Sequence, residues 1–326
     1  MNKLKKIGLS ALAGSLVAIS ANAVEVSISG GATMYMSKGA ETTATGLSMS
    51  DSVTFTSSGE TDGGVNISIS IELDGDTPAD AAGTNVLDSR HIKFGTDSLG
   101  TVTFSGHGGD SVLGGMDDVT PNAYEEVWDG VTSADADVIG GYGGNNLVRY
   151  DSPSVGGVVF SAAYQDVGTD TATAGSERTS AYTDFGVTIS PEMVEGLSLG
   201  YAAGSYDASA TTSGDENTMY AKYTYGSFTL GYQQSEIDLG SSTNTDESEA
   251  FGISYAVNDD LSISYGEHTV DFGSGTTDQE ASGFSASYTM GGMTIAGMTN
   301  TVDNVGGSTD ASNDKEGYEI SLSFAF

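Results

Sequence analysis

Cysteine is absent from this chain of 326 residues, and basic side chains are scarce, with ten Lys and Arg against 45 Asp and Glu. Without cysteine, no disulfide can staple an exported fold and no thiolate can hold a metal ion. The formal net charge of −35 offers no basic footprint to nucleic-acid phosphates and no attraction to anionic lipid headgroups. These absences exclude a disulfide scaffold, a cysteine metal site and a nucleic-acid partner.

Long apolar runs are also missing, except at the N-terminus. Three lysines within the first six residues precede a mostly apolar stretch over 7–19, and Ala21-Asn22-Ala23 supplies the small-residue pattern at which signal peptidase cleaves. We predict a signal peptide over 1–23, export through the Sec pathway and a mature domain over 24–326. Because no later stretch has the length of a transmembrane helix, the mature chain can cross a membrane only as a β-barrel.

Apolar and polar residues alternate along most of the mature chain, most clearly in 24–37 and 316–326. Strict alternation places one face of a strand against an apolar phase and the other against water. We predict an all-β fold, a transmembrane antiparallel β-barrel of about sixteen strands, at 24–37, 49–58, 64–74, 89–96, 100–107, 145–151, 157–166, 178–190, 197–208, 216–225, 228–237, 247–256, 261–271, 280–290, 293–302 and 316–326.

The connections between these strands alternate between long and short. Long connections are predicted at 38–48, 75–88, 108–144, 167–177, 209–215, 238–246, 272–279 and 303–315. The short ones include a Gly-Gly hairpin at 290–293, a strong turn signal. An outer-membrane barrel has short periplasmic turns and long external loops, whereas a soluble sandwich has no reason for this alternation. The pattern favours an outer-membrane barrel over a secreted β-sandwich or a repetitive adhesin.

The last strand carries a more specific pattern, because its apolar residues alternate with polar ones up to a terminal phenylalanine. It looks like the C-terminal signal that barrel-assembly machinery reads, carried here by Tyr318, Ile320, Leu322, Phe324 and Phe326. With this segment and its overall layout, the mature chain resembles the Gram-negative general porins, most closely the sixteen-stranded alphaproteobacterial type. The resemblance implies a homotrimer in the outer-membrane lipid, and passive diffusion of small hydrophilic solutes and ions through a water-filled pore.

The connection over 108–144 is the longest, at about 37 residues. In the resembled family the third long loop folds into the barrel and forms the constriction of the pore, and we expect the same of 108–144. The alternative is a disordered external loop, but ten apolar residues in the segment need a surface to cover. The loop contains no Lys or Arg, and its predicted constriction residues are Asp110, Asp117, Asp118, Glu125, Glu126, Asp129, Asp135 and Asp137.

In the resembled family, basic residues of the barrel wall face this loop. Strand parity turns a few basic side chains of this chain inward, and we predict that the basic wall consists of His91, Lys93, Arg149, Arg178 and Lys222. Basic side chains avoid the lipid face in any case, because each costs about 2–4 kcal/mol at the bilayer midplane. The excess of acids over bases predicts a pore that prefers cations.

Catalytic constellations are not evident. The histidines are His91, His107 and His268, and serines are abundant, but no nucleophile elbow and no phosphate loop follows a strand. We therefore predict no enzymatic activity and no cofactor, while the acidic loops Asp207–Glu216 and Asp303–Glu316 leave calcium binding open. The remaining alternative is an outer-membrane structural or adhesin barrel without an open pore, which would expose 108–144 at the surface.

Overall fold

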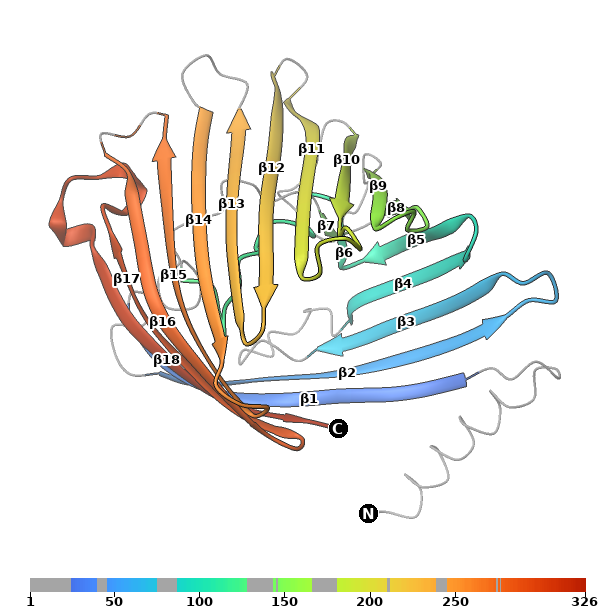
Figure 1. Ribbon diagram of the computed structural model, residues 1–326, viewed down its shortest axis with the longest axis horizontal. Coiled ribbons are helices and arrows are strands. Elements are labelled where there is room, and N and C mark those ends of the chain that lie inside the picture. Colours follow the sequence, from blue (N-terminus) through green and yellow to red (C-terminus); the bar gives the residue numbers. More distant parts are fainter. Residues whose placement is uncertain are drawn as a thin grey trace.

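The described strands close into a single antiparallel barrel of sixteen members, which confirms the predicted fold and strand number (Figure 1). The computed structural model describes residues 25–39, 46–74, 87–127, 143–144, 146–165, 181–209, 212–238, 245–273, 275 and 277–326. The predicted signal peptide over 1–23 lies outside these residues and stays a prediction.

Each barrel strand pairs with its neighbours along the chain, and the first pairs with the last. The sixteen strands are β1 Glu25–Lys38, β2 Gly46–Glu60, β3 Asn66–Asp74, β4 Leu87–Thr96, β5 Gly100–His107, β8 Leu147–Asp151, β9 Val158–Gln165, β10 Tyr182–Ile189, β11 Leu197–Ser209, β12 Thr212–Tyr225, β13 Phe228–Asp238, β14 Thr245–Ala256, β15 Leu261–Phe272, β16 Gln279–Met290, β17 Met293–Asp303 and β18 Lys315–Ala325. A separate short pair is formed by β6 Gly109–Asp110 and β7 Gly143–Gly144.

Closure is completed where the first and the last strand pair. β1 pairs with β18 from Gly31 opposite Ala325 to Lys38 opposite Tyr318. One residue further on, Gly30 and Phe326 exchange two backbone hydrogen bonds, with N to O distances of 3.0 and 2.9 Å. A Cβ at Gly30 would lie 2.5 Å from the carbonyl oxygen of Ser52, so only glycine fits this close approach. From Gly30 to Lys38 the seam therefore satisfies the backbone groups of β1, which would be costly if left unpaired in hydrocarbon.

Apolar residues cover the outside of the barrel and polar residues its inside. On β3, Ile67, Ile69 and Ile71 are between 38 and 45% exposed. A soluble protein would not be expected to expose a row of isoleucines to water. The intervening Ser68 and Ser70 point to the interior, where Ser70 lies 3.4 Å from the hydroxyl of Thr56. This arrangement places lipid outside and water inside.

Aromatic side chains cluster on the outer face close to the short turns. The rings of Phe228 and Tyr255 lie 4.5 Å apart between centroids, and Tyr223 stacks on Tyr225 at 6.5 Å. Rings of this kind suit the interface between hydrocarbon and headgroups.

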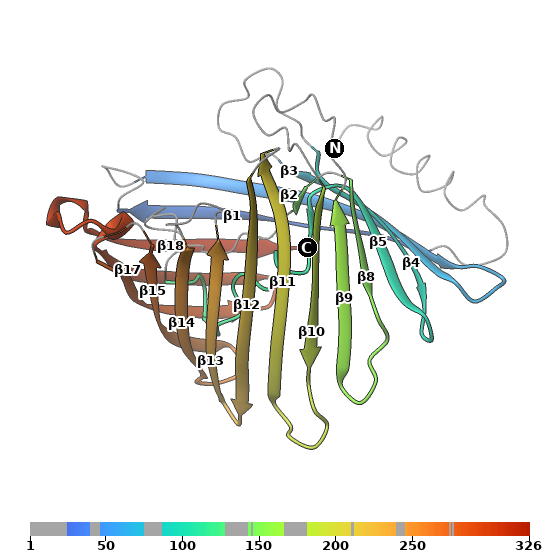
Figure 2. The same ribbon diagram turned by 90° about the horizontal axis from the view of Figure 1, so that it is seen from above.

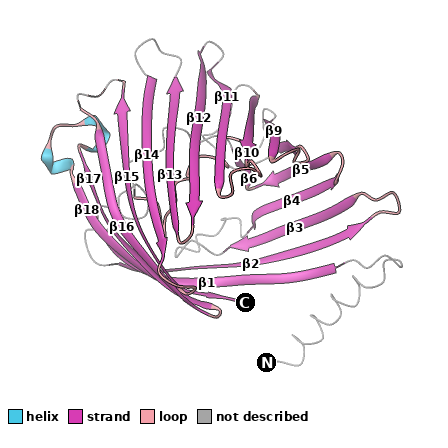
Figure 3. Ribbon diagram, in the orientation of Figure 1, coloured by secondary structure: helices cyan, strands magenta, loops and turns pink. Residues whose placement is uncertain are grey.

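Strand boundaries differ from the prediction mainly at one external connection. β11 and β12 extend into the predicted long connection 209–215, where Ser209 pairs with Thr212. Alternating residues continue the hairpin there, so this loop is shorter than predicted. Within the described residues, helix is confined to two short 3₁₀ turns, η1 Val305–Gly307 and η2 Ala311–Asn313 (Figure 3). No helix in the described part of the chain could span a membrane.

Two neighbouring lysine substitutions on β3 test which face meets lipid. We expect Ile69→Lys to lower the free energy of unfolding by about 2–4 kcal/mol, the cost of a lysine at the bilayer midplane. Ser70→Lys should fold almost as stably, because its side chain enters water. The measurement is urea unfolding in lipid vesicles followed by heat-modifiable gel mobility. Equal destabilisation by both substitutions would contradict the assigned faces.

Candidate functional site

The long connection after β5 enters the barrel. Its described part, 108–127, hydrogen-bonds to inward-facing side chains of β8, β10, β13, β15, β16, β17 and β18. The segment, in teal, lies within the ring of strands in two perpendicular views (Figures 1 and 2). We call 108–127 the inner loop. Its hydrogen bonds reach seven of the sixteen barrel strands.

The first turn of the inner loop is held from both sides. Arg149 Nη1 on β8 donates to the carbonyl of Ser111 at 2.9 Å, and the backbone N–H of Leu113 donates to Asp184 Oδ2 on β10 at 2.8 Å. Tyr182 Oη donates toward both Asp184 and Glu216, each at 3.1 Å. Leu113 itself is completely buried against the wall. Buried carboxylates are costly without such donors, so this network fixes the loop at one place.

Gln233 on β13 holds the middle of the inner loop through both ends of its amide. Its Nε2 donates to the carbonyls of Met116 and Asp117 at 2.6 and 3.1 Å, and its Oε1 accepts from the N–H of Val119 at 3.1 Å. The side chain is only 2% exposed. A buried amide satisfied in this way specifies one loop position, because each lost partner would leave a desolvated polar group.

A row of inward glycines makes room for the second half of the inner loop. Gly231, Gly252, Gly266 and Gly283 occupy consecutive strands β13 to β16 and lie directly opposite one another in the ladder. We call these four residues the glycine row. A Cβ at Gly231 would lie 2.4 Å from Pro121 Cδ, and one at Gly266 would lie 2.9 Å from Val127 Cγ1. The loop therefore lies in a trough of the wall, which a larger residue at Gly231, Gly252 or Gly266 would fill.

Further hydrogen bonds hold the loop beyond Pro121. The N–H of Ala123 donates to the hydroxyls of Ser264 at 2.9 Å and Ser285 at 3.2 Å, and these two hydroxyls lie 2.6 Å apart. Asn300 Nδ2 donates to the carbonyl of Val127 at 2.8 Å. The loop thus reaches β17, far around the barrel from β5.

Tyr124 connects the loop to β18, next to the closing seam. Its hydroxyl donates to Glu319 Oε1 at 2.6 Å. Burial raises the pKa of Tyr124 well above its usual value, and the bond to the Glu319 carboxylate raises it further. The phenol therefore stays protonated at physiological pH and keeps donating.

The predicted acidic residues occupy two kinds of position on the inner loop. Asp110 and Asp118 are exposed, whereas Asp117, Glu125 and Glu126 are half-buried. Asn122 donates to Glu126 within the loop. The remaining predicted acids, Asp129, Asp135 and Asp137, lie outside the described residues.

The predicted basic residues do not form one cluster. Arg149 contacts Asp151 at 3.1 Å in addition to the loop carbonyl, so its charge is locally compensated. His91 Nδ1 lies 2.8 Å from Ser105 Oγ, and Lys93 is exposed on the same inward face of β4. Lys222 lies on β12, opposite Gly231 at the end of the glycine row. Arg178 lies outside the described residues.

The wall that the inner loop leaves open consists of β1, β2 and β3. None of the described residues on these three strands is buried, whereas inward side chains such as Thr218, Gln233 and Asn300 are at most 2% exposed. The inward residues of the open wall are mostly serine and threonine. Sequence parity had placed them inward, but it gave no sign that the loop would avoid them.

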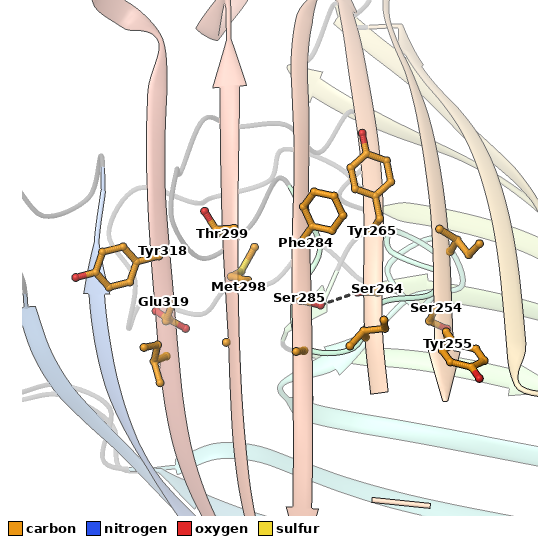
Figure 4. A pocket seen from close by; sticks show the side chains of 15 residues that line it. Ser254, Tyr255, Ser264, Tyr265, Phe284, Ser285, Met298, Thr299, Tyr318 and Glu319 are labelled. Atoms are coloured by element: carbon orange, nitrogen blue, oxygen red, sulfur yellow. Dashed lines mark hydrogen bonds between the residues drawn. The ribbon is translucent and has the colours of Figure 1, made fainter. Parts of the chain in front are cut away.

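One apolar hollow of the protein lies outside the pore. A groove of about 670 Å³ runs over the outer face of β14 to β18, where Tyr255, Tyr265, Phe284 and Tyr318 border it (Figure 4). These side chains face hydrocarbon, so we assign no solute to it. Within the described residues, no group of three or more His, Asp or Glu side chains is arranged to hold a metal ion.

A closed barrel with an apolar outside, a polar inside and a loop laid across its interior defines the class of outer-membrane channels. The model of the Gram-negative porin family matches residues 8–326. The chain therefore belongs to the Gram-negative porin family and is a porin of the Gram-negative outer membrane. Its family is one of diffusion channels and not of enzymes, as the sequence predicts.

Solved structures with the same fold share little sequence with this chain. The anion-selective porin from Comamonas acidovorans superposes with a TM-score of 0.71 at 16% identity, over 93% of this chain and 100% of that one. A loop-deletion mutant of OmpT, an outer-membrane protein of Vibrio cholerae, gives 0.68 at 13% identity with the same coverage. A mutant porin of Rhodobacter blastica gives 0.63 at 16% identity, again over 93% and 100%. A search of curated sequences found no significant match.

Filling the trough tests whether the inner loop controls the pore. We expect Gly231→Val to push Pro121 off the wall and into the free lumen, and so to lower the single-channel conductance in planar bilayers. Thr183→Val is the control, because it places valine on the outer face of β10, away from both the loop and the passage. Unchanged conductance in heat-modifiable, folded Gly231→Val protein would contradict this role.

Proposed function

We propose that the constriction lies between the inner loop and the open wall of β1 to β3, and that the pore prefers cations. The observation that carries this proposal is the charge distribution around the free lumen. Asp110 and Asp118 are exposed on the loop side, and Glu72 lies inward on β3. Carboxylates around a narrow passage raise the local concentration of cations.

The inward bases oppose this preference only weakly. Arg149 is engaged by Asp151 and by the loop backbone, and His91 is bonded to Ser105. Lys93 is the exposed inward base nearest the open wall, opposite Ser68 of β3. The Comamonas acidovorans porin is described as anion-selective, so the shared fold does not decide whether a pore prefers cations or anions. That preference depends on the charged side chains that each porin has at its own constriction.

Solutes pass such a channel without chemical change. Molecules that fit the passage diffuse through it, and the side-chain charges bias which ions follow. The inner position of 108–127 supports a channel over the alternative of an adhesin, which would present this segment at the surface.

We further propose that the outer face of β1 and β2 packs against other copies in a homotrimer. Asp51 lies near the middle of β2, opposite Ala32, with its side chain outward among Met34, Met49 and Leu322. A carboxylate at such a depth in lipid is unfavourable. A protein partner that hydrogen-bonds it removes this cost.

The terminal residues are proposed as the signal for barrel assembly. Tyr318, Ile320, Leu322 and Phe324 share the outward face of β18, and Phe326 follows at the periplasmic end. Ile320 and Phe324 are each 44% exposed, which leaves them accessible to assembly machinery before the seam closes.

Neutralising the exposed loop acids tests the ion preference. We expect the double variant Asp110→Asn/Asp118→Asn to lower the cation-to-anion permeability ratio by roughly threefold, since one charge near a passing ion contributes up to about 1 kcal/mol in water. The ratio comes from the reversal potential under a salt gradient. The control is Asp259→Asn, in a turn remote from the loop. Selectivity that stays constant, or that shifts further toward cations, would contradict the proposal.

A substitution at Asp51 tests the proposed subunit face. We expect Asp51→Leu to lower the temperature at which the oligomer dissociates in detergent gels, because the interface loses a polar contact. Ile263→Leu, on the outer face of β15, should leave that temperature unchanged. If Asp51→Leu strengthened the barrel and left its oligomeric state alone, Asp51 would face lipid and the proposal would be wrong.

A further inference from the structure

The open wall has a composition that the rest of the lumen lacks. Every inward position of β1 between Ser27 and Ser37 carries a hydroxyl, apart from Gly31, and so does every inward position of β2 between Ser48 and Ser58. Ser68 and Ser70 continue the surface onto β3. We call this surface, the inward residues of 27–37, 48–58 and 68–70, the hydroxyl wall.

Hydrogen bonds between side chains place the hydroxyl wall inside the barrel. Thr33 Oγ1 donates to Ser323 Oγ at 3.0 Å, and Ser323 has the same parity on β18 as Glu319, which holds Tyr124 of the inner loop. Tyr35 Oη lies 3.0 Å from Ser50 Oγ and so carries the surface on to β2. These bonds show that the residues of the hydroxyl wall on β1 and β2 face the lumen, as the inward residues of β18 do.

Solutes in the lumen can reach these hydroxyls. Ser27, Ser29 and Ser48 are exposed, and the other members are partly exposed. Ser264 and Ser285, by contrast, are buried and bind the backbone of Ala123. The same residue type thus anchors the loop on one side of the barrel and faces open water on the other.

Charged side chains border the hydroxyl wall but do not interrupt its residues on β1 and β2. On β1 and β2 the charged inward residues are Glu25 and Glu60, at the ends of the strands. Inward charge next appears at Glu72 and Asp74 on β3, which lie opposite Thr54 and Ser52, and at His91 and Lys93 on β4. Asp118 of the inner loop adjoins β13, far around the ring from β1 and β2, whereas Asp110 lies beside His91 on β4. A cation is attracted most strongly near these carboxylates and only weakly beside β1 and β2, because Coulomb attraction falls with distance.

We propose that the hydroxyl wall is the path of small neutral polyhydroxylated solutes, and that it runs beside a separate path for cations along the inner loop. This inference rests on the proposed pore, whose solute class it names. Each serine or threonine hydroxyl both donates and accepts, so it can replace a water molecule at either kind of solute hydroxyl group.

The energetics of such a path favour passage over retention. Exchanging a water hydrogen bond for a protein one contributes little net free energy, so no single position traps the solute. A repeated row of weak sites lets a molecule enter and leave, which conduction requires. Charged side chains in the same positions would instead hold ions by electrostatic attraction.

Replacing hydroxyls without changing side-chain size tests the inference. The variant Thr54→Val/Thr56→Val/Ser70→Ala removes three hydroxyls from the centre of the wall. Swelling of proteoliposomes in D-glucose is measured beside the potassium conductance of the same preparation. We expect the glucose rate to fall about threefold, since each hydrogen bond contributes modestly over water, while the potassium conductance stays close to that of the unmodified protein.

Two controls separate the hydroxyl effect from a change in packing. Thr54→Ser/Thr56→Ser/Ser70→Thr keeps the hydroxyls and should retain glucose permeation. Thr183→Val makes the same chemical change on the outer face of β10 and should have no effect. A variant without the three hydroxyls that passes glucose at the unmodified rate would overturn the inference and leave the pore intact. An unmodified protein that conducts neither potassium nor glucose would instead overturn the proposed pore itself.

Discussion

Backbone hydrogen bonding in a medium without water is the constraint on which this structure depends. A strand in hydrocarbon must give every N–H and C=O a partner, so the sheet has to close. The seam between β1 and β18, finished by Gly30 and Phe326, meets that demand. Closure also fixes which residues alternate outward and inward, and hence where lipid and water lie. The outer isoleucines and the inner serines of β3 are two consequences of one requirement.

A ring of sixteen strands leaves an interior that wall side chains alone do not fill. The inner loop occupies part of that space, and the wall is adapted to it. The glycine row lowers the surface where Pro121 and Val127 lie, and Gln233 satisfies the loop backbone in the middle. Because these adaptations lie on one side, the water-filled passage is pushed to the other, against the hydroxyl wall.

Period-two alternation was enough to predict the strands and their faces, because each is set by local pattern and by lipid outside. Arg149 and Lys222 were placed inward by parity alone, but parity could not show that Arg149 bonds to Ser111 and Asp151. Such partners depend on contacts between segments far apart in sequence. The glycine row left a readable signal, namely glycine at inward positions of successive strands. The glycines can be interpreted only when the strand register is known, because a register shift of one residue would turn them to the outer face.

Accessibility of single cysteines inside the open barrel tests the central claim, a passage bounded by the inner loop on one side and by β1 to β3 on the other. The native chain has no cysteine, so each substitution introduces a unique thiol. A water-soluble thiol reagent of moderate bulk is added to single channels of Thr54→Cys and Ser264→Cys. The account predicts a stepwise loss of conductance for Thr54→Cys and none for Ser264→Cys, which the loop covers. Block at Ser264→Cys with none at Thr54→Cys would contradict it.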